Sequence, residues 1–525
     1  SLEVASGGAI RTRGTATLSG DVDLEIEISA LALAPFRAYA GADAALDGEL
    51  AGNVRVQGAA ADPASISADL ALRAARFALG DIAVAGAIAA RVEIAHALRQ
   101  PSGRFELDAG NAELRYGGAF TKPAGTPASI RGRIVTDEKG GLATDDLELR
   151  IRDFEATGSA RIGPPLRVDV GRASVDLTGW EALVPALAAA PPSGRVRAEG
   201  LRFVGEPRGL TGSIHLEDVR VKPQQLSAPI TARGELIARG SELESRGLTF
   251  AAAGQPIAVD LRLRDLFGTP RYEVDTRMDA VDANALVTAF AGKPDTLQGP
   301  LSLKGSYRGA LHPGQSALEA LNGEVALDIE KGRLAGVSLL QATFAQLGAL
   351  GSLGAVALDA GRLFGGRDLQ RFYGDEFESI RARLRIVDGV IHAEPLTLLY
   401  SAYGAQLTGT LHLSDLSLDM QGRLNIYEDV DASIARNAGA RSYQPSSRSI
   451  PLASVRGTLD APKVQVAGRS GLDFATGYAK SLYGEQLKGI LDKELGKDAG
   501  RAIGGVLEGI LGGSAKEPPP TPENH

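Results

Sequence analysis

Apolar and polar residues alternate through most of the first 466 residues. Apolar residues alternate, with few breaks, with charged or small residues in segments such as 22–28, 130–135, 195–203 and 381–386. Because successive side chains of a strand point to opposite faces, this period of two predicts strands with one apolar and one polar face. Turn-forming residues divide the segments, as at Asp388-Gly389, a pair typical of hairpins. The pattern predicts an all-β chain of short strands.

The longest alternating stretch covers residues 384–424. We expect breaks in it only at Asp388-Gly389, Glu394-Pro395 and Ser414-Asp415. One face of the resulting meander carries Leu384, Ile386, Leu407, Leu411, Leu413, Leu416, Leu418, Met420 and Leu424. A similar face near the amino end carries Leu24, Ile26 and Ile28. These residues are the candidate lining of an apolar groove, unless the face packs against a second protein sheet.

A repeat lies within the alternating region. Three segments align: residues 26–34, 168–176 and 274–282. Each is followed by a strand with two glycines six positions apart: Gly52 and Gly58, Gly194 and Gly200, Gly299 and Gly305. Short Ala/Leu stretches at 182–192 and 285–294 end in proline and predict one or two helical turns. The repeating module is strand, short helix, strands, which is typical of elongated architectures whose units bury their faces against neighbours.

The size of the predicted sheet sets its form. With roughly 16–18 residues for each strand and its turn, the alternating region makes about 25–30 strands, at a spacing of about 4.8 Å. Open sheets rarely exceed about 10 strands without curling. Aromatic residues are only 5% of the chain, with one Trp, so bulky core anchors are scarce. We therefore predict an elongated, strongly curled antiparallel or mixed sheet that forms a hydrophobic groove, a β-taco, with short crossing helices.

Four regions are expected along the chain. Residues 1–290 form repeating β-groove modules, 291–468 a second β region, 469–515 an amphipathic helical segment and 516–525 a disordered tail. The uncharged run 337–358 contains several glycines and polar residues, so we interpret it as a buried helix and loop rather than a membrane span.

Composition and spacing exclude several kinds of chemistry. The chain has no Cys, a net charge of −8 and a pI of about 5.5, so thiolate chemistry and nucleic-acid binding are not expected. Its six His are scattered without metal-ligand spacing, and the glycine-rich run 504–516 lacks the ending of a phosphate loop. The acidic residues Asp375, Glu376 and Glu378 form a solvated charge run. We predict no catalytic residues, no metal and no cofactor, and hence no enzyme.

Three segments in order, 317–341, 381–424 and 449–468, resemble the carboxy-terminal region of the AsmA-like proteins of Gram-negative bacteria. This resemblance implies membership of the repeating β-groove lipid-transfer superfamily. It implies a periplasmic protein that binds phospholipid acyl chains, carries lipid between the inner and outer membranes or their proteins, and maintains the outer membrane. It also implies an inner-membrane helix at the amino end, which is not among these 525 residues.

Two other interpretations stay open at this stage. The same sheet would serve a structural or adhesive surface protein if its apolar face enclosed a protein-filled core. A β-solenoid enzyme acting on polysaccharide would require carboxylates that meet in space on neighbouring coils, and nothing in the sequence favours this. A filled core would leave no continuous lumen and no bound lipid.

Overall fold

The computed structural model describes residues 2–3, 7–37, 45–96, 99–136, 141–223, 226–312, 321–351, 364–412, 417–437, 448–458, 461–467 and 474. It is mainly β, with 67% of the structure in strands and 11% in helices. The chain forms two compact units. The first comprises Ser1–Asp295, Leu301–Val325 and Ile386–Gly389, and the second comprises Thr296–Pro300, Ala326–Arg385 and Val390–His525.

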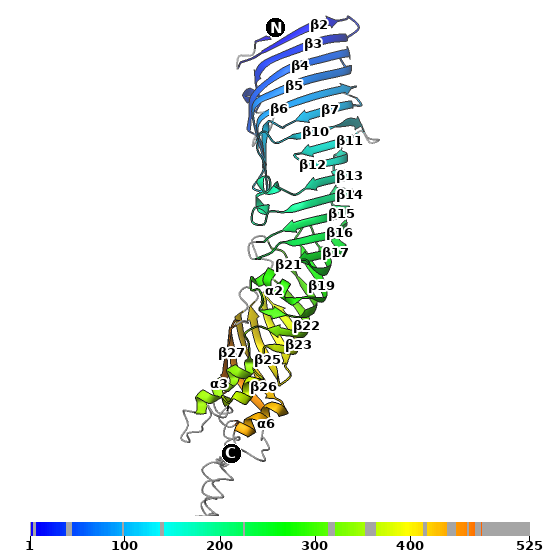
Figure 1. Ribbon diagram of the computed structural model, residues 1–525. Coiled ribbons are helices and arrows are strands. Elements are labelled where there is room, and N and C mark those ends of the chain that lie inside the picture. The colour runs from blue at the N-terminus through cyan, green and yellow to red at the C-terminus, as the bar shows by residue number, and fades with distance from the viewer. Residues whose placement is uncertain are drawn as a thin grey trace, which may run out of the picture. The chain divides into compact units, whose positions relative to one another are not determined.

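The first unit is an open antiparallel sheet in which strands pair with their neighbours in the chain (Figure 1). Its amino-terminal strands are β1 (Leu2–Glu3), β2 (Ala9–Ala16), β3 (Asp21–Ala32), β4 (Ala45–Ala59), β5 (Asp62–Leu79), β6 (Ile82–Ala95), β7 (Ser102–Asp108), β8 (Ala112–Tyr116), β9 (Phe120–Lys122) and β10 (Ala128–Thr136). They are followed by β11 (Leu142–Ile151), β12 (Phe154–Ile162), β13 (Arg167–Asp176), β14 (Ser193–Gly205), β15 (Arg208–Val221), β16 (Ile230–Gly240), β17 (Glu242–Ala252), β18 (Gln255–Arg264), β19 (Arg271–Asp282) and β21 (Pro300–Ala310).

The hairpin of β8 and β9 is inserted into this simple order. The first half of β6 pairs with β8, its second half pairs with β7, and β7 then pairs with β10. The fully buried Lys122 on β9 closes the insertion, because its Nζ donates to the carbonyl oxygens of Ala112 at 2.5 Å and Ala109 at 2.9 Å. Burial lowers the pKa of the Lys122 amine. The lysine thus ties together the backbone on both sides of the turn between β7 and β8.

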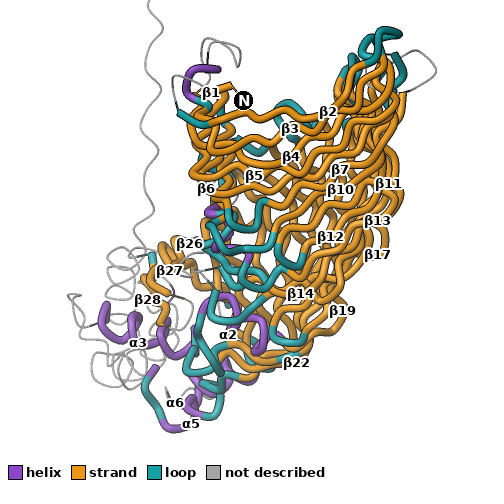
Figure 2. The backbone as a smooth tube through the Cα atoms, turned by 90° about the horizontal axis from the view of Figure 1, so that it is seen from above, coloured by secondary structure: helices purple, strands orange, loops and turns teal. Residues whose placement is uncertain are grey.

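Bulges recur along the strands of the first unit. The pairing register shifts around Ala30, Ala74, Asp146 and Asp218, and each of these residues has a positive φ. An extra residue in one strand bends it and increases its twist. Figure 2 accordingly shows these strands bent along their length rather than flat.

The bulge at Asp218 depends on a glycine in the neighbouring strand. Gly194 on β14 lies opposite the bulge and has φ +97°, in a region that other residues rarely adopt. A Cβ at this position would lie 2.8 Å from the Cα of Val219 and overlap the backbone of Asp218. The glycine therefore permits the close approach of β14 and β15. It is also the first glycine of the second repeat found in the sequence.

Short helices follow the strands that contain the three aligned segments. The turn η1 (Ala34–Phe36) follows β3, η2 (Trp180–Ala182) and η3 (Pro185–Leu187) follow β13, and α2 (Ala283–Ala291) follows β19. Asp282 caps α2 by accepting a hydrogen bond from the backbone N–H of Asn284 at 2.9 Å, and Gly292 ends the helix in the left-handed conformation. The short helices expected within 182–192 and 285–294 are therefore present.

The second unit combines strands with helices. Its strands are β20 (Leu297–Gln298), most of β22 (Asn322–Leu334) and of β23 (Glu376–Val387), β24 (Val390–Leu399), β25 (Tyr403–His412), β26 (Ser417–Ile426), β27 (Ser449–Thr458) and β28 (Ala461–Val466). Its helices are α3 (Leu339–Gly351), α5 (Arg367–Gln370) and α6 (Glu428–Asn437). Helix α3 packs against β28, and its Leu340, Phe344 and Leu347 are buried. The core of this unit therefore includes one face of α3.

One expected turn is wrong. Strand β24 continues through Glu394-Pro395, with a register shift between Ala393 and Leu396. The chain reverses instead after Leu399, where the N–H of Tyr400 donates to the carbonyl of Tyr403 at 2.8 Å. A bulge accommodates the proline because a bulged position needs no ladder hydrogen bond.

Two other expectations concern helices. The amphipathic helical segment expected at 469–515 and the tail 516–525 lie outside the described residues, apart from Phe474. None of the helices in the described part of the chain combines the length and apolar character required to span a bilayer. The uncharged run that begins at Val337 instead supplies the buried helix α3.

Candidate functional site

Apolar side chains form continuous rows across the first unit. On β3, Leu24, Ile26 and Ile28 share one face because they are two positions apart. Ile26 lies opposite Val54 of β4, and Leu24 lies opposite Val56. The rows therefore continue from one strand to the next, because the pairing register places apolar residues opposite each other.

The rows continue through the following strands. Val56 pairs with Ile66 of β5, and Ile66 pairs with Ile94 of β6. Further along the sheet the same face holds Val168 opposite Phe203, Val196 opposite Leu216 and Leu261 opposite Val274. We call this set of rows on the first unit the apolar face.

Most of the larger side chains of the apolar face are only half-buried. This holds for Leu24, Ile26, Ile28, Val54 and Ile66, and for the residues paired with them in β6. Small residues of these strands such as Ala75 and Ala143 are buried, and so are Ile257 and Val259 on the same face of β18. The described residues thus leave much apolar side-chain surface of this sheet accessible, which is unusual for a face of this size in a packed domain.

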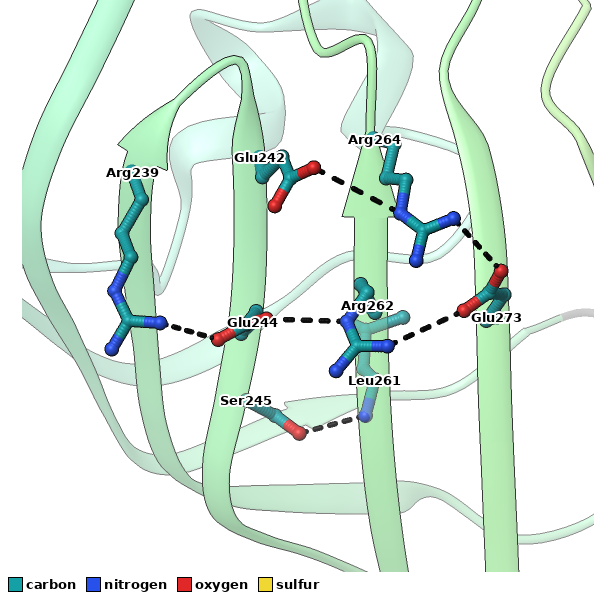
Figure 3. Close-up of polar contacts among 8 residues, drawn as sticks. All are labelled: Arg239, Glu242, Glu244, Ser245, Leu261, Arg262, Arg264 and Glu273. Carbon is teal, nitrogen blue, oxygen red and sulfur yellow. Dashed lines mark hydrogen bonds and ion pairs between the residues drawn. The ribbon is translucent and has the colours of Figure 1, made fainter.

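The opposite face of the same sheet is charged. Figure 3 shows a cross-strand series of ion pairs in which carboxylates and guanidinium groups alternate. Glu244 Oε2 lies 2.8 Å from Arg239 Nη1, and Glu244 Oε1 lies 3.2 Å from Arg262 Nε. Glu273 continues the series, 3.6 Å from Arg262 Nη1 and 3.2 Å from Arg264 Nη1. This face is therefore hydrophilic and suited to contact with solvent.

The same arrangement occurs near the amino end. Arg55 lies 3.3 Å from Asp23, and Arg91 lies 3.1 Å from Asp69. Hydrogen bonds from Gln57 and Arg55 lower the pKa of the Asp23 carboxyl. Because these side chains are exposed, such pairs add little stability, but they fix which face of the sheet meets solvent.

The predicted lining residues of the second β region have different surroundings. Leu407, Met420 and Leu424 are fully buried within the second unit, and Ile386 near the end of β23 is buried too. Leu384, Leu411 and Leu418 are half-buried. Leu413 and Leu416 lie outside the described residues.

In the second unit, protein therefore covers much of the face formed by the predicted lining residues of β25 and β26. Met420 lies opposite Val455 and Leu424 opposite Ile450, and all four side chains are buried. The buried rings of Phe344 and Phe364, 5.3 Å apart, belong to the same unit. Of the predicted residues, Leu24, Ile26 and Ile28 are the ones that lie on the apolar face of the first unit.

Several residues of the apolar face were not singled out from the sequence. Val54 and Val56 on β4, Ile66 on β5 and Val92 and Ile94 on β6 all alternate with polar residues. That alternation is the signal that could have identified them. Sequence alone could not rank them against the equally regular strands of the second unit.

No metal-binding or carboxylate-pair site is found at the acidic residues 375–378. Asp375 Oδ2 lies 2.8 Å from Arg333 Nε. Partial burial opposes ionisation of Asp375, but the hydrogen bonds from Arg333 and from the Gly336 N–H outweigh it and lower the pKa. Glu376 and Glu378 are exposed. Within the described ranges, no group of three or more His, Asp or Glu residues is placed to hold a metal ion.

Comparisons with known proteins identify no family for this chain. A scan of the chain against protein-family models found no match, and a search of curated proteins found none.

Proposed function

We propose that the apolar face of the first unit binds the acyl chains of phospholipids in a groove. The observation that carries this proposal is the half-burial of Leu24, Ile26 and Ile28 together with their cross-strand partners. A ligand with long hydrocarbon chains would cover this surface and remove it from water. The charged outer face would remain in solvent.

The energetics of such binding do not require a particular side chain. Burial of a methylene group is worth about 0.8 kcal/mol, so a chain of about 16 carbons gains on the order of 12 kcal/mol in any dry apolar groove. The rows of Leu, Ile and Val offer nearly equivalent contacts along the sheet. A lipid that moved along them would meet a nearly flat energy profile.

We further propose that this binding serves transport of phospholipid between membranes, without catalysis. The resemblance of segments 317–341, 381–424 and 449–468 to AsmA-like proteins supports a periplasmic location and a role in maintaining the outer membrane. It also supports attachment to the inner membrane and partners at both membranes. The row geometry supports the acyl-chain part of this proposal independently.

A structural or adhesive role is the second candidate. The observation in its favour is the burial of Leu407, Met420 and Leu424, because a sheet face covered by protein has no room for a ligand. If the first unit were filled in the same way by other protein, the chain would be a rigid surface element.

Lipid content separates the two functions. The full chain would be purified under native conditions with two unrelated detergents and from two hosts, then extracted and analysed by mass spectrometry. The transport proposal predicts phospholipid in near-stoichiometric amounts in every preparation. Protein free of lipid in all of them would contradict the proposal and favour the structural role.

A further inference from the structure

Two arginine side chains of the second unit meet at one buried serine. Arg371, which directly follows α5, donates from Nη2 to Ser433 Oγ at 3.1 Å, and Arg436 of α6 donates from Nη2 to the same oxygen at 2.7 Å. Ser433 is 0% exposed, and its hydroxyl donates to the carbonyl of Asp429 at 2.9 Å. The serine thereby holds two cationic groups side by side.

The two guanidinium groups of this pair repel each other. Both donor nitrogens contact the same oxygen atom, so the two positive charges lie close together. The neutral hydroxyl of Ser433 does not offset their repulsion. Asp431, the buried acid of α6, is paired with a different arginine, Arg448, at 3.1 Å. Among the described residues, no carboxylate forms an ion pair with Arg371 or Arg436.

The pair is held in place and open to solvent. The Arg371 guanidinium lies 4.6 Å from the centre of the Phe372 ring, and α5 packs against α6. Both arginines remain exposed, although their tips are anchored on Ser433. A guanidinium has five N–H donors in a planar fork, so each side chain keeps donors available for a further acceptor.

We propose that Arg371 and Arg436 together bind the phosphate group of a phosphorylated ligand. A phosphate supplies several acceptor oxygens and the negative charge that the pair lacks, and arginine forks match its geometry. If the chain carries phospholipid, as proposed above, the ligand is the lipid headgroup, and this assignment rests on that function. Free phosphate offers the same chemistry.

The test compares two double variants of the full chain. Arg371→Gln/Arg436→Gln removes the site, and Arg383→Gln/Arg423→Gln removes the same charge from exposed positions on β23 and β26. Calorimetry would measure binding of dihexanoyl phosphatidic acid below its micelle concentration, of inorganic phosphate, and of dihexanoylglycerol, which has no phosphate. Thermal unfolding would check folding, and Arg371→Gln alone would replace the first variant if that one unfolds.

The proposal predicts that the site variant binds phosphatidic acid about tenfold or more weakly, while the control changes by less than about twofold. An equal loss in both variants would overturn the site. Inorganic phosphate that binds as tightly as phosphatidic acid, and only when the site is intact, would overturn the headgroup assignment and support a free phosphate ligand. Failure of dihexanoylglycerol to bind would count against the acyl-chain proposal and leave the phosphate result standing.

Discussion

Ile26 and Val54 lie directly opposite each other on β3 and β4, and both side chains are only half-buried. The adjacent pair, Glu25 and Arg55, has its side chains on the other face of the same two strands. One step along the strand therefore leads from apolar surface to charged surface. The proposed function depends on this two-faced character.

A charge on the apolar face is expected to weaken lipid binding. Ile66 lies between Val56 and Ile94, so Ile66→Asp would place a carboxylate where an acyl chain must desolvate it. We expect binding of a fluorescent phospholipid to weaken by about tenfold or more, since burial of a charge without a partner is costly.

Ser67→Asp is the matched control, because Ser67 is the next residue on β5 and is exposed on the opposite face. Its binding should equal that of the unaltered protein. Equal affinity of both variants would show that the apolar face does not contact lipid.

A methyl group at Gly194 is expected to damage the bulge between β14 and β15. Alanine pays about 1–2 kcal/mol for a left-handed conformation in open space, which is the case at Gly200, where an added Cβ meets nothing within 4 Å. At Gly194 the Cβ would also overlap the backbone of the neighbouring strand. Urea unfolding should therefore show a larger loss of stability for Gly194→Ala than for Gly200→Ala, and the reverse order would refute the role of the bulge.

The second unit should lose stability at high pH through Tyr400. Its ring stacks on that of Tyr403 with the centroids 4.4 Å apart, and burial raises the pKa of Tyr400 to about 12. Above pH 10 the unfolded chain releases the phenolic proton that the folded chain retains, so stability falls as the pH rises from 10 to about 12. A shift of this size corresponds to about 2–3 kcal/mol.

Tyr400→Phe keeps the ring and removes the titrating hydroxyl. Its unfolding free energy should fall less steeply over this pH range. Tyr116→Phe, at an exposed position, is the control. Identical slopes for Tyr400→Phe and the unaltered protein would contradict the assignment.

The ion pairs of the outer face are expected to matter little for stability. Glu244 is shared by Arg239 and Arg262, yet it is partly exposed, so Glu244→Gln should cost less than about 1 kcal/mol. Lipid binding should be unchanged, because the side chain lies on the face away from the proposed ligand. A loss of several kcal/mol in urea unfolding would show that the series acts as a cooperative network.

The strands and their two faces could be predicted from the sequence. Alternation in residues 22–28 predicted the face of Leu24, Ile26 and Ile28, and the turn at Asp388-Gly389 separates β23 from β24 as expected. The turn at Glu394-Pro395 was wrong because the rule for proline in strands holds for regular ladders, and this strand is bulged.

The surroundings of each face could not be predicted from alternation. Leu24 and Leu424 occupy the same kind of position in their strands, yet Leu24 is half-buried and Leu424 is fully buried. What covers a face depends on contacts between distant segments, which a local period of two does not encode. The meeting of Arg371 with Ser433 is of this kind, because 62 residues separate them.

The most direct measurement is photo-crosslinking of lipid from the two faces of one strand. A benzophenone amino acid would replace Ile26 on the apolar face of β3 or Glu25 on its charged face, and adducts would be identified by mass spectrometry after irradiation in cells. We expect phospholipid adducts at position 26 and none at position 25. Adducts at neither position, or equally at both, in protein that is folded and abundant, would contradict lipid binding at the apolar face.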